Sequence, residues 1–276
     1  ADNNNVPDGV YTISSAGDYK FTCSQETANR IVVDGTTISE QGNINIYLNN
    51  VKINTSDDPA LKIAANVKAK VTICLTGTNN LITTNKNSAG LQKNNEAQLI
   101  ITSASGTTAG IINARNASND GVGAGIGGGH RGSCSNITIN GGSVNASSKS
   151  GAGIGGGGLY GPCSNITINS GSVNASSESG AGIGGGEGGS CSNITINGGS
   201  VNARSTESGA GIGGGSGGSG SNITINSGSV TARSTDGAGI GGGLYGSCGN
   251  ITINGGSVKA SSVKASSVSS SPTNAK

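Results

Sequence analysis

Hydrophobic and polar residues alternate in short segments that recur along most of the chain. The segment Asn-Ile-Thr-Ile-Asn occurs five times, with successive copies 28 or 29 residues apart. In an extended strand its two isoleucines fall on one face, and its Asn and Thr side chains fall on the other. One such strand cannot bury its apolar face alone, so the repeat predicts that successive copies stack on one another. The copies begin at Asn136, Asn165, Asn193, Asn222 and Asn250.

Each repeat also contains two further β-prone pieces, which Gly- and Ser-rich turns separate. The motif Gly-Ala-Gly-Ile-Gly-Gly-Gly precedes each copy, and a Ser-Val pair follows it. We therefore expect three strands per coil, with coils stacked about 4.8 Å apart around a narrow aliphatic core. Equivalent isoleucines should form two core ladders. The first ladder is Ile137, Ile166, Ile194, Ile223 and Ile251, and the second is Ile126, Ile154, Ile183, Ile212 and Ile240.

The period continues upstream in a degenerate form. Ile44, Val71 and Leu99 begin similar segments at intervals of 27 and 28 residues, whereas Leu99 and Ile137 are 38 residues apart, which predicts an inserted loop around 113–122. The pattern predicts an all-β fold, a right-handed, single-stranded parallel β-helix of about eight coils of 27–29 residues. The predicted regions are an N-terminal cap (1–43), the β-helix (44–258), with degenerate coils over 44–120 and regular coils over 121–258, and a C-terminal tail (259–276).

The composition fits a thin core and argues against several partners. The 276 residues include 52 glycines and no Trp or Met, and the formal net charge is +2. This balanced charge argues against a nucleic-acid partner, and no apolar run is long enough for membrane insertion. The polar start of the chain is compatible with a mature secreted protein. We therefore expect an extracellular or cell-surface location.

Motifs that resemble catalytic or ligand-binding signatures have simpler explanations. The run that begins at Gly123 satisfies the dinucleotide pattern GxGxxG, but it recurs in every regular coil and no helix is predicted after it. Calcium-binding β-rolls carry a regular Asp in each Gly-rich repeat, and these runs lack it. His130 is the single histidine, which excludes a repeated Ser-His or Cys-His system. The sequence therefore predicts no enzyme activity, no metal site and no cofactor.

Acidic residues recur at one corner of the regular coils. Glu178, Glu207 and Asp236 occupy similar positions in successive coils. Arg204 and Arg233 lie three residues before Glu207 and Asp236, so we expect surface ion pairs at this corner rather than calcium binding.

Cysteines form a partial column beside the repeated Asn. Cys134, Cys163 and Cys191 each stand two residues before it, and stacking would place their Cα atoms about 4.8 Å apart, within the range for a disulfide. A disulfide ladder and a buried column of free thiols both fit this spacing. Cys191 and Cys248 lie two coils apart and cannot pair.

The polar face allows more than one interpretation. Each Asn-Ile-Thr is a glycosylation sequon, but glycans on every coil would crowd one another. Ladders of hydrogen-bonded Asn amides explain the repeated Asn more simply. The Thr column from Thr138 to Thr252 resembles the flat arrays of ice-binding solenoids, which is a minor alternative.

Variation within a strict repeat indicates where function lies, because changes map to loops on one side. The loop after each Gly run differs between coils, and Leu-Tyr occurs in it twice, three coils or roughly 14 Å apart. The tyrosines are candidates for stacking on sugars or for a subunit contact, and a local plug over the corner is the alternative. The candidate binding or interface residues are Leu159, Tyr160, Leu244, Tyr245, His130 and Arg131.

The segments 44–53 and 71–81, together with the Gly-Ala-Gly-Ile-Gly-Gly-Gly and Asn-Ile-Thr-Ile-Asn-Gly-Gly-Ser-Val units, carry a family resemblance. They resemble clostridial cellulose- and pectin-binding β-helix surface proteins and related GAGIGGG-repeat surface proteins of anaerobic bacteria and some protists. The resemblance covers about residues 31–260. It implies secretion, surface display and calcium-dependent polysaccharide binding.

The favoured functional hypothesis is a non-catalytic, structural or adhesive β-solenoid that assembles with itself, end to end or laterally, into a surface filament. The alternative is a polysaccharide-binding module of the cellulose or pectin type, and ice binding is less favoured. Because a solenoid leaves unpaired strand edges at its ends, the strand-prone tail 259–276 should either fold over its own end or lend a strand to a neighbouring molecule.

Overall fold

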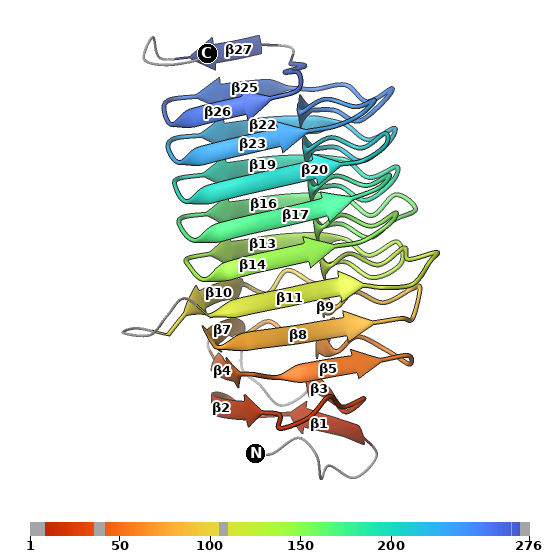
Figure 1. Ribbon diagram of the computed structural model, residues 1–276, viewed down its shortest axis with the longest axis vertical. Coiled ribbons are helices and arrows are strands. Elements are labelled where there is room, and N and C mark those ends of the chain that lie inside the picture. Colours follow the sequence, from red (N-terminus) through yellow and green to blue (C-terminus); the bar gives the residue numbers. More distant parts are fainter. Residues whose placement is uncertain (1–8, 36–41, 105–109, 266, 271–276) are drawn as a thin grey trace.

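The chain winds into a solenoid of parallel strands. The computed structural model describes residues 9–35, 42–104, 110–265 and 267–270, and these residues contain no helix. In Figure 1 the near strands run from left to right as the chain climbs from its N-terminal to its C-terminal end, which makes the coil right-handed. The fold is the parallel β-helix that the repeat predicted, with about eight turns and three strands per turn.

Three parallel sheets form the wall of the solenoid, and each full coil adds one strand to sheet A, then to sheet C, then to sheet B. Sheet A contains β2 (Gly17–Thr22), β4 (Asn43–Asn49), β7 (Lys70–Thr76), β10 (Leu99–Ser103), β13 (Cys134–Ile139), β16 (Cys163–Ile168), β19 (Cys191–Ile196), β22 (Gly220–Ile225), β25 (Asn250–Ile253) and β27 (Ser267–Ser270).

Sheets B and C complete the wall. Sheet C contains β5 (Lys52–Thr55), β8 (Thr78–Thr83), β11 (Ile111–Asn116), β14 (Ser143–Ser147), β17 (Ser172–Ser177), β20 (Ser200–Ser205), β23 (Ser229–Arg233) and β26 (Ser257–Ala260). Sheet B contains β1 (Val10–Ile13), β3 (Arg30–Val33), β6 (Leu61–Ile63), β9 (Leu91–Lys93), β12 (Ile126–Gly127), β15 (Ile154–Gly155), β18 (Ile183–Gly184), β21 (Ile212–Gly213) and β24 (Ile240–Gly241).

Equivalent isoleucines stack in single columns. In sheet A, Ile137 is in register with Leu99 on one side and with Ile166 on the other. The column continues through Ile194, Ile223 and Ile251, and a second column in sheet B runs from Ile126 through Ile154, Ile183 and Ile212 to Ile240. These side chains are at most 1% exposed. Burial of this continuous apolar column is the main favourable contribution to folding.

Asparagine ladders hold the corners and the outer faces together. The first Asn of each repeat lies at a bend with left-handed backbone; Asn165, for example, has φ 53°. Asn tolerates this conformation better than most residues. Its Nδ2 donates to Oδ1 of Asn136 at 3.0 Å, and Nδ2 of Asn193 donates to Asn165 at 3.0 Å. The amides at the sequons therefore form ladders, as predicted.

The two ends of the solenoid differ. Near the N-terminal end, the described part of 1–43 contributes β1, β2 and β3 to sheets A and B. Phe21 is buried there and meets Tyr11 edge to face, with ring centroids 5.0 Å apart. At the C-terminal end, Val263 forms a bridge to Ile240, and β27 pairs with β25. The described part of the tail therefore pairs with its own end of the solenoid, the first of the two predicted alternatives.

The prediction of one inserted loop around 113–122 was wrong. Residues 111–116 form β11, which lies in register with β14 in sheet C. The extra residues fall on both sides of this strand, between Ser103 and Ile111 and between Asn116 and Ile126. Residues 111–116 alternate between inward-facing and outward-facing side chains, which is the pattern of a strand rather than of a loop. Residues 105–109, within the first insertion, lie outside the described part of the chain.

Candidate functional site

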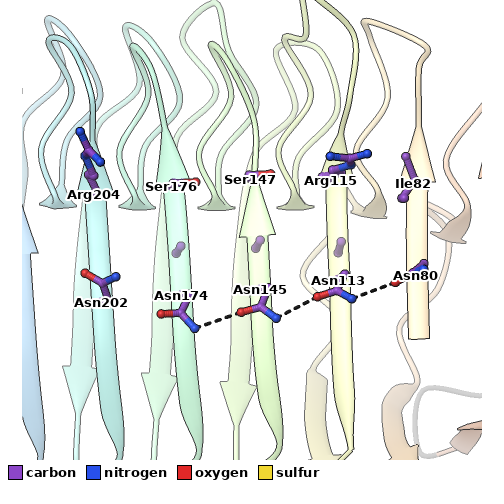
Figure 2. A pocket seen from close by; sticks show the side chains of 13 residues that line it. Asn80, Ile82, Asn113, Arg115, Asn145, Ser147, Asn174, Ser176, Asn202 and Arg204 are labelled. Carbon is purple, nitrogen blue, oxygen red and sulfur yellow. Dashed lines mark hydrogen bonds between the residues drawn. The ribbon is translucent and has the colours of Figure 1, made fainter. Parts of the chain in front are cut away.

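The outer face of sheet C carries a hollow. It is a shallow groove of about 610 Å³ that crosses β8, β11, β14, β17 and β20. Two rows of side chains line it, and Figure 2 shows both rows running across the strands. One row consists of Asn80, Asn113, Asn145, Asn174 and Asn202, and the other consists of Ile82, Arg115, Ser147, Ser176 and Arg204.

The asparagine row is held by hydrogen bonds between neighbouring coils. Nδ2 of Asn113 donates to Asn80 at 2.8 Å, Nδ2 of Asn145 donates to Asn113 at 2.8 Å, and Nδ2 of Asn174 donates to Asn145 at 3.0 Å (Figure 2). A primary amide has two N–H donors and an oxygen with two lone pairs. Each amide inside this ladder uses one donor and one lone pair, so it retains one of each for a ligand. The row offers these groups at a regular spacing of about 4.8 Å.

The second row carries two arginines separated by two serines. Arg115 is in register with Ser147, Ser147 with Ser176, and Ser176 with Arg204. Both arginines are exposed, and the two short serines between them leave the hollow open (Figure 2). The guanidinium groups therefore stand three coils apart, about 14 Å by strand spacing. Arg233 continues the row beyond Arg204.

The predicted ion pairs of Arg204 with Glu207 and of Arg233 with Asp236 do not form, although all four residues lie in the described part of the chain. Among the described residues, Arg204 and Arg233 have no carboxylate partner, because sheet C directs them onto its outer face. Glu207 instead accepts a hydrogen bond from Oγ of Ser179 at 2.9 Å. Glu178 faces Lys149 at 3.9 Å, a solvent-exposed pair of small energetic value. The guanidinium groups therefore keep their donors available to a ligand.

The variable loops lie at a different corner, between sheets B and A. Tyr160 and Tyr245 are 75% and 93% exposed, and Leu159 is also exposed. Together with Glu187, Gly188, Ser216 and Gly217 they line a slot of about 240 Å³. Leu244 is partly buried and does not line the slot. His130 and Arg131 are exposed one coil earlier, where Arg131 N–H donates to the Gly158 carbonyl at 3.0 Å.

Two family models match separate parts of the chain. A model described as "Carbohydrate-binding domain-containing protein" matches residues 7–110. A model described as "Beta helix repeat" matches residues 137–158, 166–187, 194–216, 223–244 and 251–267. The chain is similar to carbohydrate-binding and β-helix proteins. No curated protein and no solved structure matches it.

These matches relate to the groove in different ways. The range similar to carbohydrate-binding domains supplies its first strand, β8, with Asn80 and Ile82. The repeat match covers most of the coils that extend the same two rows. The finer resemblance to cellulose- and pectin-binding surface proteins stays a prediction.

The cysteines are free thiols in this structure, which corresponds to the second of the two arrangements that their spacing allows. Cys134, Cys163 and Cys191 lie in register in β13, β16 and β19 and are buried. Burial and the neighbouring Cys163 raise the pKa of Cys134 to about 12. Contact with Cys191, together with burial, raises the pKa of Cys163 well above its usual range. Disulfide formation proceeds through a thiolate, and this buried environment disfavours the thiolate.

Lys93 is a buried polar residue that sequence reasoning missed. It is fully buried on the inner side of β9, in register with Ile63. Nζ donates to the carbonyl oxygens of Asn95 and Ser135, each at 2.7 Å. Burial lowers its pKa, and nearby Cys134 opposes that shift. The alternation of Leu91-Gln92-Lys93 places Lys93 on the inner side, and this was the available signal.

Two features are absent from the described parts of the chain. No group of three or more His, Cys, Asp or Glu side chains is arranged to hold a metal ion. No helix with the length and hydropathy of a membrane span was found.

Proposed function

We propose that this protein is a non-catalytic, polysaccharide-binding solenoid that acts outside the cell or on its surface. The glycan chain lies along the groove on sheet C, parallel to the axis of the solenoid. The observation that carries this proposal is the row of hydrogen-bonded asparagines, which repeats free donors and acceptors in step with the coils.

A polymer with a regular repeat suits this surface better than a compact ligand does. The groove is shallow and spans five strands, so an extended chain contacts more of it than a small molecule would. Sugar hydroxyls both donate and accept hydrogen bonds, as the free groups of the asparagine row do. Arg115 on β11 and Arg204 on β20 add planar sets of donors. The similarity of residues 7–110 to carbohydrate-binding domains supports the same ligand class.

The filament hypothesis stays a prediction. The pairing of β27 with β25 covers the C-terminal edge of sheet A with a strand from the same chain. A neighbouring molecule would have to add to β27 or displace it. The ice-binding alternative and the extracellular location also stay predictions.

Affinity electrophoresis through gels that contain a soluble polysaccharide tests the proposal. One gel set contains a neutral β-glucan and another contains polygalacturonate, each with and without a calcium chelator. The groove variant combines Asn145→Ala with Asn174→Ala. Its matched control combines Asn169→Ala with Asn197→Ala, which removes two amides from a similar ladder that directly follows the sheet A strands β16 and β19. We expect the wild type and the control to be retarded by at least one of the two polysaccharides.

The groove variant should be retarded less than the wild type and the control. Both double variants lose ladder hydrogen bonds, so their midpoint temperatures of thermal unfolding should fall by similar amounts. Equal retardation of the groove variant and the control would contradict the proposal, as would migration of the wild type unaffected by either polysaccharide.

A further inference from the structure

A second hollow lies at the corner between sheets B and A. We propose that the slot between Tyr160 and Tyr245 binds a neutral pyranose residue of a glycan. This slot lies outside the groove on sheet C and shares none of its lining residues. The proposal therefore stands or falls independently of the groove.

Glycines in the two intervening coils create the floor of the slot. The residues that correspond to Tyr160 and Tyr245 in these coils are Gly188 and Gly217. A Cβ atom on Gly188 would lie 2.6 Å from Cδ1 of Tyr160, so the first ring lies over this glycine. A Cβ atom on Gly217 would meet nothing within 4 Å. Open space therefore remains between the ring of Tyr160 and Tyr245.

Both tyrosines occupy a backbone conformation that normally favours glycine. The φ angles are 73° at Tyr160 and 63° at Tyr245, and Gly188 and Gly217 adopt 74° and 72° at the same corner. A large side chain costs conformational energy there, which the two glycine coils avoid. Each ring is mostly exposed, so burial of the ring does not offset this cost. Strained residues of this kind cluster at ligand-binding sites.

The chemistry of the slot favours a neutral sugar. Two aromatic rings flanking a backbone floor can pack against the apolar C–H faces of a pyranose. Glu187 lines the slot, and its carboxylate has no hydrogen-bond or ion-pair partner among the described residues. It can accept hydrogen bonds from sugar hydroxyls, but it would repel the carboxylate of a uronate. Ser216 adds a hydroxyl beside it. By contrast, no acidic side chain lines the groove on sheet C.

Isothermal titration calorimetry of the whole chain tests this proposal. The probes are cellohexaose, xylohexaose and mannohexaose as neutral ligands and hexagalacturonate as the charged one. The slot variant combines Tyr160→Gly with Tyr245→Gly, which installs the residue that equivalent coils already carry, so the fold should be retained. A second variant, Gly217→Tyr, fills the slot while keeping both original tyrosines.

At least one neutral probe should bind the wild type, with about tenfold weaker affinity in each slot variant. The groove variant Asn145→Ala with Asn174→Ala should keep this affinity, which separates failure of the slot from failure of the groove. Glu187→Gln should allow the slot to bind hexagalacturonate, because the substitution removes the carboxylate that repels a uronate. The proposal is overturned if no neutral probe binds, or if both slot variants bind as the wild type does. It is also overturned if Tyr→Gly substitution converts a dimer into a monomer, because the slot would then be a subunit contact.

Discussion

A Cβ atom on Gly155 would overlap the carbonyl oxygen of Gly184, one coil further along the solenoid. The two residues are in register in sheet B, and Gly155 has φ 139°, which side-chain-bearing residues rarely adopt. The corner is therefore tight because backbone packs directly on backbone. The Gly run is repeated in every regular coil because of this stacking. No phosphate-binding role is required to explain the repetition.

Replacement of Gly155 by Ala should be severely destabilising. The added methyl group must displace the next coil, and the residue must leave its backbone conformation. We expect the free energy of unfolding to fall by about 4 kcal/mol or more, measured by urea denaturation. Gly141→Ala is the matched control, because its Cβ would meet nothing closer than 3.8 Å and its φ is not positive. Similar losses in the two variants would contradict this packing argument.

A core substitution tests the stacked isoleucine column. Ile194 is fully buried between Ile166 and Ile223, so Ile194→Ala removes apolar contacts and leaves a cavity. We expect a loss of about 2–5 kcal/mol in the free energy of unfolding. Thr195→Ala, on the opposite face of the same strand, should cost less than about 1 kcal/mol. A reversed order of the two losses would show that Ile194 does not face the core.

The asparagine bend makes a prediction about two substitutions at one position. Asn165→Gly removes the amide ladder but keeps the left-handed backbone available, whereas Asn165→Ala loses both. The Ala variant should therefore be less stable than the Gly variant by about 1 kcal/mol. Thermal denaturation monitored by circular dichroism measures the difference. A more stable Ala variant would indicate that the backbone conformation does not govern this position.

Burial of Cys134 predicts a stability change at alkaline pH. Its thiol has a pKa of about 12 in the folded chain, against a usual value of 9.0. The folded state therefore favours the protonated thiol, and the resulting stability is present below pH 9 and is lost as pH rises towards 12. The loss should approach about 1.4 kcal/mol per pH unit within this window.

Comparison with Cys134→Ala isolates this contribution. Lys93, whose pKa is lowered by burial, acts in the opposite direction and is present in both proteins. Urea denaturation at several pH values between 8 and 11 should therefore show a steeper decline in the wild type than in the variant. Parallel declines would contradict the assignment of a buried, neutral thiol.

The regular coils could be predicted from the sequence because their spacing repeats nearly without change. Equal intervals put Ile166 beside Ile137, and the burial of both follows from strict alternation. The position of the insertions could not be predicted with the same certainty, because the interval from Leu99 to Ile137 gives their total length without dividing it. Residues 111–116 have a strand pattern of their own, and pairing with β14 decided their place.

The groove was harder to predict than the fold. Its arginines are far apart in the sequence, and local spacing suggested that Arg204 would pair with Glu207. Arg204 instead faces outward on β20, where it lies in a row with Ser176. The tyrosine corner was accessible from the sequence because Leu-Tyr interrupts a glycine-rich repeat. The open floor at Gly217 required the backbone geometry.

The most direct test of the central claim is NMR observation of side-chain amides during titration with the polysaccharide fragment that binds best. We predict that the amide resonances of Asn145 and Asn174 shift in a saturable manner, while those of Asn169 and Asn197, which directly follow strands β16 and β19, stay unchanged. Saturable shifts confined to Asn169 and Asn197, or none at any of the four residues, would contradict binding in the groove on sheet C.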